Sequence, residues 1–234
     1  MTTCWSFHRD GLLSVVWRPA AALYLGCCLV ALAVGLWPEA IMPPEYSTTL
    51  MPPPALRTLA AGQGVFVLLI YPLVLWRRCR RGAPAGYFLR AAAESAGLLM
   101  ATIPFYITAG YFADATAADV IRAVIAVALL LPVAWTAGLL SARGVLRPVV
   151  VLVLVFAAVG GPAMVYITRE FLPEFAAGAG VASPVILLWQ TAAPRQDALV
   201  PQPVWAAVLW PALAAAALLA QMLVPHRPGG QEGE

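Results

Sequence analysis

Residues 145–167, VLRPVVVLVLVFAAVGGPAMVYI, form an almost uninterrupted apolar run in which Arg147 is the one charged residue. The hydrocarbon core of a bilayer is about 30 Å thick, and about 20 apolar residues cross it as an α-helix. Comparable runs recur along the chain: 62% of its 234 residues are hydrophobic and only 11% are charged. A soluble domain carries roughly 25% charged residues, so the composition predicts an integral membrane protein.

Six apolar runs, separated by polar or proline-rich breaks, predict an all-α fold with six transmembrane helices. They extend from about Pro19 to Trp37, Ala61 to Trp76, Ala91 to Phe112, Ala118 to Leu140, Val145 to Ile167 and Val204 to Val224. The second run is short unless Leu56 to Ala60 extend it. The first is followed by Trp37-Pro38-Glu39 rather than by a small-residue cleavage site, so we interpret it as a retained span.

The distribution of arginine predicts the orientation. Six spans place both termini on one side of the membrane, and with the termini inside, ten arginines lie in inner segments against four in outer ones. Because positively charged residues accumulate on the cytoplasmic side, we expect both termini in the cytoplasm and a multi-pass protein of the plasma (inner) membrane.

The first eighteen residues have a different pattern. They mix Trp5, Leu12 and Val16, which fall near one helical face, with charged residues, as is typical of an amphipathic helix lying in the membrane interface. We therefore divide the chain into an N-terminal interfacial helix over residues 1–18 and a six-helix transmembrane domain over residues 19–234.

A short apolar stretch, Val181 to Trp189, precedes the last run. At about nine residues it is too short to span, and a re-entrant or interfacial helical piece is expected, tolerated in the membrane only where protein buries its backbone ends. Ser183 would cap its N-terminus, and Pro184 would occupy the first turn. Trp189 would anchor the piece at the level of the headgroups. These three residues form a candidate gate.

Motifs for chemistry are missing from the sequence. All fourteen basic residues are arginine, which excludes a P-loop lysine, and there is no HExxH, GxSxG or GxGxxG motif and no metal-type spacing of Cys or His. We expect no catalytic residue, cofactor or metal, and the net charge of +3 forms no basic patch for nucleic acid. Glu94, four residues after Arg90, is the acidic residue closest to an intramembrane position. We expect it to form an interfacial contact with Arg90, or alternatively to have a gating or coupling role.

The order of these elements resembles a known family. The features are an amphipathic helix ending in Trp17-Arg18-Pro19, a second span running into Arg77-Arg78-Cys79-Arg80-Arg81-Gly82, a short inner turn at Ser141 to Gly144, and a long outer segment with Ser183-Pro184 before the sixth span. This layout is similar to that of the permease subunit of type-two ABC exporters. The family often has acidic residues within the arginine stretch, and this chain has none there.

The resemblance implies partners and site residues. It implies two permease subunits per transporter, a separate cytoplasmic ATP-binding subunit, and short re-entrant helices in the outer segment. Carried over by position, contacts with the ATP-binding subunit fall on Arg9, Arg18, Arg78, Arg81 and Gly82. The function expected is therefore a non-enzymatic permease subunit of an ATP-driven exporter in the lipid bilayer. A non-transporting membrane assembly or anchoring protein is the alternative.

Overall fold

The computed structural model describes residues 19–41, 54–79, 86–141, 147–171, 183–192 and 204–223. Over these ranges the protein is all-helical. The predicted interfacial helix over residues 1–18 lies outside the described residues, and so do Arg9, Arg18, Arg81 and Gly82.

The helices follow the apolar runs closely. In chain order they are α2 (Pro19–Ile41), α4 (Ala55–Val65), the π-helical turn η1 (Phe66–Ile70), α5 (Tyr71–Cys79), α6 (Tyr87–Phe112), α7 (Ala117–Ser141), α8 (Arg147–Val155), the π-helical turn η3 (Phe156–Gly160), α9 (Gly161–Phe171), α11 (Pro184–Thr191) and α12 (Val204–Leu223). The second helix begins at Ala55, which confirms that Leu56 to Ala60 extend the short second run.

Five of these helical segments are long and apolar enough to cross a membrane, as in a multi-pass membrane protein. They are Ala20–Trp37, Ala55–Arg77, Tyr87–Phe112, Ala117–Ser141 and Arg147–Thr168. The sixth predicted span coincides with α12, a helix of 20 residues. Its crossing of the membrane stays a prediction.

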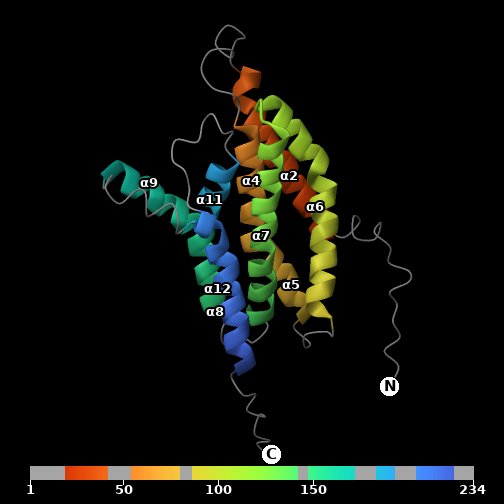
Figure 1. Ribbon diagram of the computed structural model, residues 1–234, viewed down its shortest axis with the longest axis vertical. Helices are drawn as coiled ribbons and strands as arrows, with labels where there is room; N and C mark the ends of the chain where they lie inside the picture. Colours follow the sequence, from red (N-terminus) through yellow and green to blue (C-terminus); the bar gives the residue numbers. More distant parts are fainter. Residues whose placement is uncertain are drawn as a thin grey trace, which may run out of the picture.

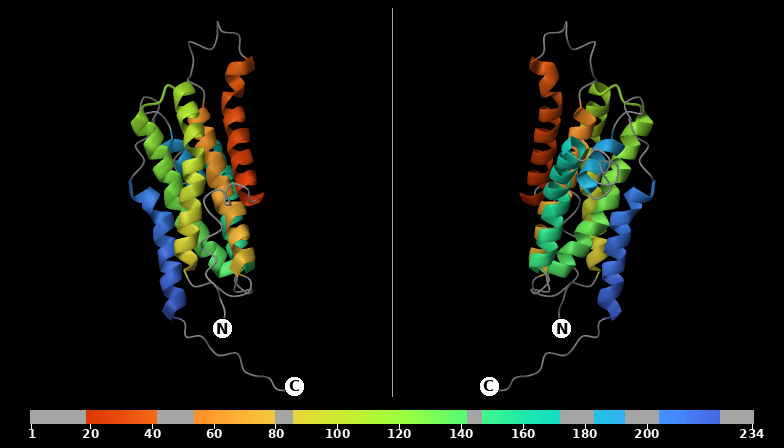
Figure 2. Two further views of the ribbon diagram at one scale, coloured as in Figure 1. Left: turned by 90° about the vertical axis from the view of Figure 1, so that its right-hand side faces the viewer. Right: turned by 90° about the vertical axis from the view of Figure 1, so that its left-hand side faces the viewer.

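The long helices run side by side in one bundle (Figures 1 and 2). Helices α4 and α7 lie at its centre, with α2 and α6 to one side and α8, α11 and α12 to the other. The end at which α5 and α7 finish and α6 and α8 begin is called the inner end here, because the arginine pattern predicts it to be cytoplasmic; the opposite end is the outer end. Helix α12 is displaced toward the inner end, and α11 occupies the outer part of the bundle beside it (Figures 1 and 2).

The core lies between the two central helices and their neighbours. Leu56, Leu68, Val127 and Ala134 are fully or almost fully buried there. A β-carbon on Gly138 of α7 would stand 2.7 Å from the β-carbon of Leu75 on α5, so glycine lets these two helices approach closely. Small residues at helix contacts are typical of membrane bundles, in which close packing replaces the hydrophobic effect between helices.

Large apolar side chains face outward from the bundle. They are exposed on α2, α6, α8 and α9, with Leu89, Tyr111, Leu152 and Phe171 each more than two-thirds exposed. In water such a surface would be unfavourable, whereas lipid chains are as apolar as these side chains. The apolar side chains that face away from the bundle therefore fit a membrane environment, as do the length and composition of the five helices.

Candidate functional site

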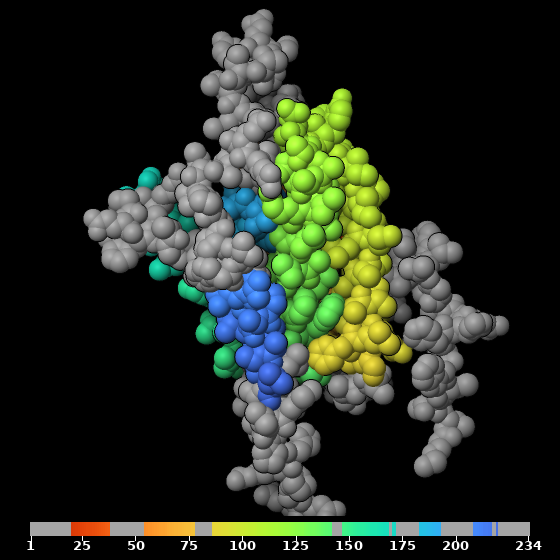
Figure 3. All heavy atoms as spheres, viewed as in Figure 1, coloured from red at the N-terminus to blue at the C-terminus, as the bar shows by residue number. Residues whose placement is uncertain are grey.

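Helix α11 is the candidate site, because it is a short helix enclosed by longer ones. Its eight residues extend about 12 Å, less than half of a hydrocarbon core. Pro184, Val185, Leu187 and Leu188 are buried, and the helix contacts α4, α7, η3, α9 and α12. Figure 3 shows α11 beside α7 and next to α12.

The N-terminus of α11 is closed by Ser183, the residue that the sequence predicted for this place. Its hydroxyl accepts a hydrogen bond from the backbone N–H of Ile186 at 3.3 Å, and Pro184 begins the first turn. The same hydroxyl donates to the carbonyl oxygen of Ala157 in η3, at 3.4 Å. Ser183 is completely buried, so this cap also attaches α11 to the fifth long helix.

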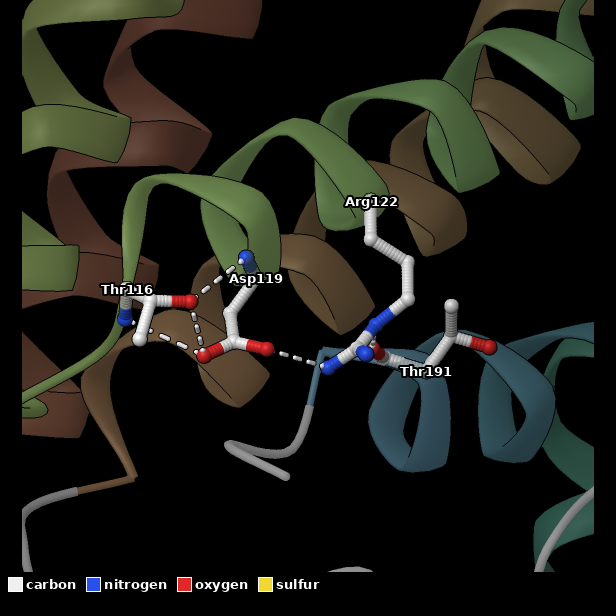
Figure 4. A network of polar contacts seen from close by, with 4 residues as sticks. All are labelled: Thr116, Asp119, Arg122 and Thr191. Carbon is white, nitrogen blue, oxygen red and sulfur yellow. Dashed lines mark hydrogen bonds and ion pairs between the residues drawn. The ribbon is translucent and has the colours of Figure 1, made fainter. Parts of the chain in front are cut away.

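The C-terminus of α11 is held by an arginine of α7 (Figure 4). Nε of Arg122 donates to the carbonyl oxygen of Thr191 at 2.9 Å, and Nη2 donates to Oδ1 of Asp119 at 2.7 Å. The Asp119 side chain is only 3% exposed and that of Arg122 is 35% exposed. Arg122 thus supplies a cation and a donor to the last carbonyl of α11, where the negative end of the helix dipole lies.

Asp119 is itself fixed by the start of α7. Its Oδ2 accepts hydrogen bonds from the backbone N–H of Thr116 at 3.0 Å and from the Thr116 hydroxyl at 2.8 Å. The Thr116 hydroxyl accepts in turn from the backbone N–H of Asp119, at 3.3 Å. This reciprocal arrangement is a capping box, and it holds the carboxylate in position before Arg122 binds to it.

Sequence reasoning missed the pair formed by Asp119 and Arg122, although two opposite charges three residues apart on one helix were a usable signal. The attachment of Arg122 to a carbonyl 69 residues further along the chain had no signal in the sequence.

The flank of α11 rests against a glycine of α4. A β-carbon on Gly64 would stand 2.2 Å from Cδ1 of Leu188, too close for any side chain larger than hydrogen without movement. Leu188 is 2% exposed, so it cannot easily turn aside. Helix α11 therefore has three attachments, at its two ends and along its side.

Two buried groups of polar side chains join the long helices of the bundle. In the first, the Tyr106 hydroxyl donates to Oε1 of Gln63 at 2.7 Å, and Nε2 of Gln63 donates to the Cys28 sulfur at 3.3 Å. These contacts connect α6, α4 and α2. Buried polar groups in an apolar bundle need such partners, so the contacts set the register between helices.

The second group is centred on Ser95 of α6. Its hydroxyl accepts from Nε1 of Trp135 at 3.1 Å, pairs with the Tyr71 hydroxyl at 3.0 Å and donates to its own helix at Ala91. The Tyr87 hydroxyl donates to the carbonyl oxygen of Trp135 at 2.8 Å. Helices α5, α6 and α7 are thereby connected by one serine and its neighbours.

Among the other predicted site residues, Trp189 belongs to α11 and is half-buried. Arg78, Arg90 and Glu94 lie apart from α11. Arg90 is exposed and Glu94 half-buried, both in the first two turns of α6 at the inner end, so the structure does not bring them to α11. Arg78 lies in the last turn of α5, also at the inner end.

In the part of the chain that the structure describes, no three His, Cys, Asp or Glu side chains gather as a metal site. No family model, curated protein or solved structure matches this chain. A function can therefore be argued only from the layout of the helices and from the attachments of α11.

Proposed function

We propose that this chain is the permease subunit of an ATP-driven exporter of the ABC type. It would sit in the plasma membrane with six spans and both termini in the cytoplasm, form a pathway with a second permease subunit, and use a separate cytoplasmic ATP-binding subunit. The observation that carries the proposal is α11: a short, capped, buried helix between the fifth long helix and α12. The resemblance drawn from the sequence implies such a helix at this place.

The geometry of α11 suits a re-entrant gate at the outer end. Backbone ends inside a membrane are tolerated where protein satisfies them, and here Ser183 supplies the acceptor at one end while Arg122 supplies the donor at the other. A helix of eight residues held by side chains can be displaced without removing a whole span from the bilayer. Pro184 and Trp189 remain the other members of the proposed gate.

The inner end supplies a route for energy from an ATP-binding subunit. The guanidinium of Arg147, the first residue of α8, lies 3.8 Å from the centre of the Trp76 ring on α5. This contact connects the arginine-rich end of the second long helix with the fifth, whose η3 turn contacts Ser183. Contacts of the ATP-binding subunit are proposed at Arg78 and Arg81, and at Arg9, Arg18 and Gly82.

The proposal is tested by reconstitution. The chain is purified from its native host with any co-purifying P-loop ATPase, and ATP hydrolysis of the complex in liposomes is compared with that of the ATPase alone. The double charge reversal Arg78→Glu with Arg81→Glu should weaken the complex at least tenfold while leaving the membrane yield of the chain unchanged, because each reversal turns an attraction into a repulsion.

A second arm of the test separates a gate from the anchoring alternative. Leu187→Pro removes the backbone hydrogen bond from Leu187 to the Ser183 carbonyl, 3.0 Å long, and should break α11. The complex would still assemble, but its coupled ATP hydrolysis should fall, whereas the volume-conserving Leu187→Met should preserve it. An anchoring protein would show no stimulated hydrolysis in either variant, and that result would reject the exporter.

A further inference from the structure

The two π-helical turns share a sequence pattern. Each begins with a phenylalanine, and a proline lies six residues after that phenylalanine: Pro72 after Phe66, and Pro162 after Phe156. In each, the residue before the proline donates its backbone N–H to the phenylalanine carbonyl, five residues back. Pro104 in α6 and Pro132 in α7 lie in helices without a π turn, so proline by itself does not produce this geometry.

In the π register the Ala157 carbonyl of the fifth helix does not receive the Gly161 N–H. Gly161 donates to Phe156, so the next π pairing would run from residue 162 to Ala157. Residue 162 is proline and has no N–H. The hydroxyl of Ser183 donates to the Ala157 oxygen instead. In an ordinary α-helix the Gly161 N–H would itself reach Ala157, four residues back, and the serine would not be needed there.

The surroundings of the two turns differ. Phe66 of η1 is 2% exposed and its ring lies 4.9 Å from that of Tyr24, so η1 is held within the core. In η3, Phe156 is 53% and Val159 57% exposed, and the turn ends at Gly160 and is followed by Gly161. Beyond η3, α9 leaves the line of α8 and points away from the bundle (Figure 1). Of the two turns, η3 is the one with room to change register.

We infer that η3 is a register switch controlled by Ser183. While Ser183 is seated against Ala157, the turn keeps its π register and α9 stays bent away from α8. When α11 withdraws, the Gly161 N–H shifts from Phe156 to Ala157, the helix becomes regular through this turn, and α9 moves toward the line of α8. The position of α11 and the bend of the fifth helix are then linked in both directions. This inference holds whether or not the chain transports a substrate.

The bend can be measured between spin labels by pulsed electron resonance. The background carries Cys4→Ala, Cys27→Ala, Cys28→Ser and Cys79→Ala, the serine retaining an acceptor for Gln63. One label pair replaces Val149 and Phe171 across η3, and a matched pair replaces Leu89 and Tyr111 on α6; all four residues are exposed. Both pairs are 22 residues apart, which corresponds to about 33 Å between backbone positions in a straight α-helix.

The wild-type protein should give a shorter distance across η3 than along α6. Ser183→Ala should shift the η3 pair toward the α6 value, lowering the ratio of bent to straight molecules by about 2- to 12-fold, the range that corresponds to one net hydrogen bond. Ser183→Thr keeps the hydroxyl and should keep the bend. Thr168→Val removes a hydroxyl that bonds only within α9, to Met164 and Val165, and should change nothing.

Two further variants distinguish the switch from general loosening. Pro162→Ala restores an N–H that can reach Ala157 in the π register, so in that background Ser183→Ala should change the ratio less than about 2-fold. Gly161→Ala keeps Ser183 but puts a β-carbon 2.7 Å from the Ser183 β-carbon, which should unseat α11 and straighten the helix. The inference is overturned if Ser183→Ala leaves the distances unchanged, or if its effect is equally large with Pro162→Ala. The α6 pair reports whether each variant keeps its bundle.

Discussion

Removing the arginine that holds the C-terminus of α11 should loosen that helix selectively. In Arg122→Met the side chain keeps its approximate length and apolar stem but loses the guanidinium, so the ion pair with Asp119 and the hydrogen bond to the Thr191 carbonyl are lost. The capping box between Thr116 and Asp119 needs no arginine and should persist, which keeps the start of α7 folded.

The expected loss of stability in Arg122→Met follows from the burial of Asp119 and Arg122. Truncating one partner of a fully buried ion pair costs about 3–5 kcal/mol, whereas an exposed pair contributes about 1 kcal/mol or less. Asp119 is buried but Arg122 is 35% exposed, and the carboxylate keeps two hydrogen bonds from Thr116. We therefore expect a loss of about 1–3 kcal/mol, carried mostly by the local attachment of α11.

Thiol labelling provides the assay. A cysteine at position 192, where Ala192 is completely buried at the end of α11, should react with a maleimide about 5- to 150-fold faster in Arg122→Met than in the parent, since local opening becomes easier by the same free energy. Thermal unfolding in detergent measures the change in stability of the whole protein. In the double variant with Asp119→Asn, the loss should be smaller than the sum of the single losses, because both substitutions remove the same ion pair. If the cysteine at position 192 reacted as slowly in Arg122→Met as in the parent, the assignment of Arg122 as the attachment of α11 would be refuted.

Three further outcomes are expected. Gly64→Ala should destabilise the protein by about 1–3 kcal/mol through contact with Leu188, and Leu188→Ala should relieve part of that loss in the double variant; additive losses in thermal unfolding would contradict the contact. Ser95→Ala removes two interhelical hydrogen bonds and should cost about 1–2 kcal/mol, with Ser95→Thr nearly neutral in the same measurement. In a background without native cysteines, Glu45→Cys should react with an impermeant thiol reagent added outside and Gly82→Cys should not; both positions lie outside the described residues, and the reverse pattern would invert the orientation.

The sequence was most informative where hydropathy alone decides structure. Apolar runs such as residues 145–167 predicted the positions of the long helices, because in a bilayer the backbone must bond within its own helix and the side chains must be apolar. Helix ends were less accurate: the third run was expected from about Ala91, and α6 begins at Tyr87. Tyr87 is aromatic and buried through its hydrogen bond to Trp135, a contact between distant residues that hydropathy does not report.

For α11, local signals in the sequence were sufficient to predict where the helix begins, but no signal predicted its contacts with distant residues. Ser183 followed by Pro184 predicted a helix start, because capping is an interaction between residues three apart in the chain. Burial of this helix against Gly64, and its attachment to Arg122, depend on residues that are remote in sequence. Neither a glycine nor a charge near a helix start carries information about the partner that it will meet.

Composition and contacts within a few residues therefore account for the helical, apolar character of the chain and for the positions of the long helices. Folding establishes which helices touch, where α11 is enclosed, and that Phe156–Gly160 adopts the π register while Pro104 stays within a regular helix. Proline by itself does not select between i→i+4 and i→i+5 hydrogen bonds, since Pro104 and Pro132 lie in helices without a π turn. The contact between the Ser183 hydroxyl and the Ala157 carbonyl joins residues 26 apart in the chain, so it forms only on folding and no local pattern in the sequence reports it.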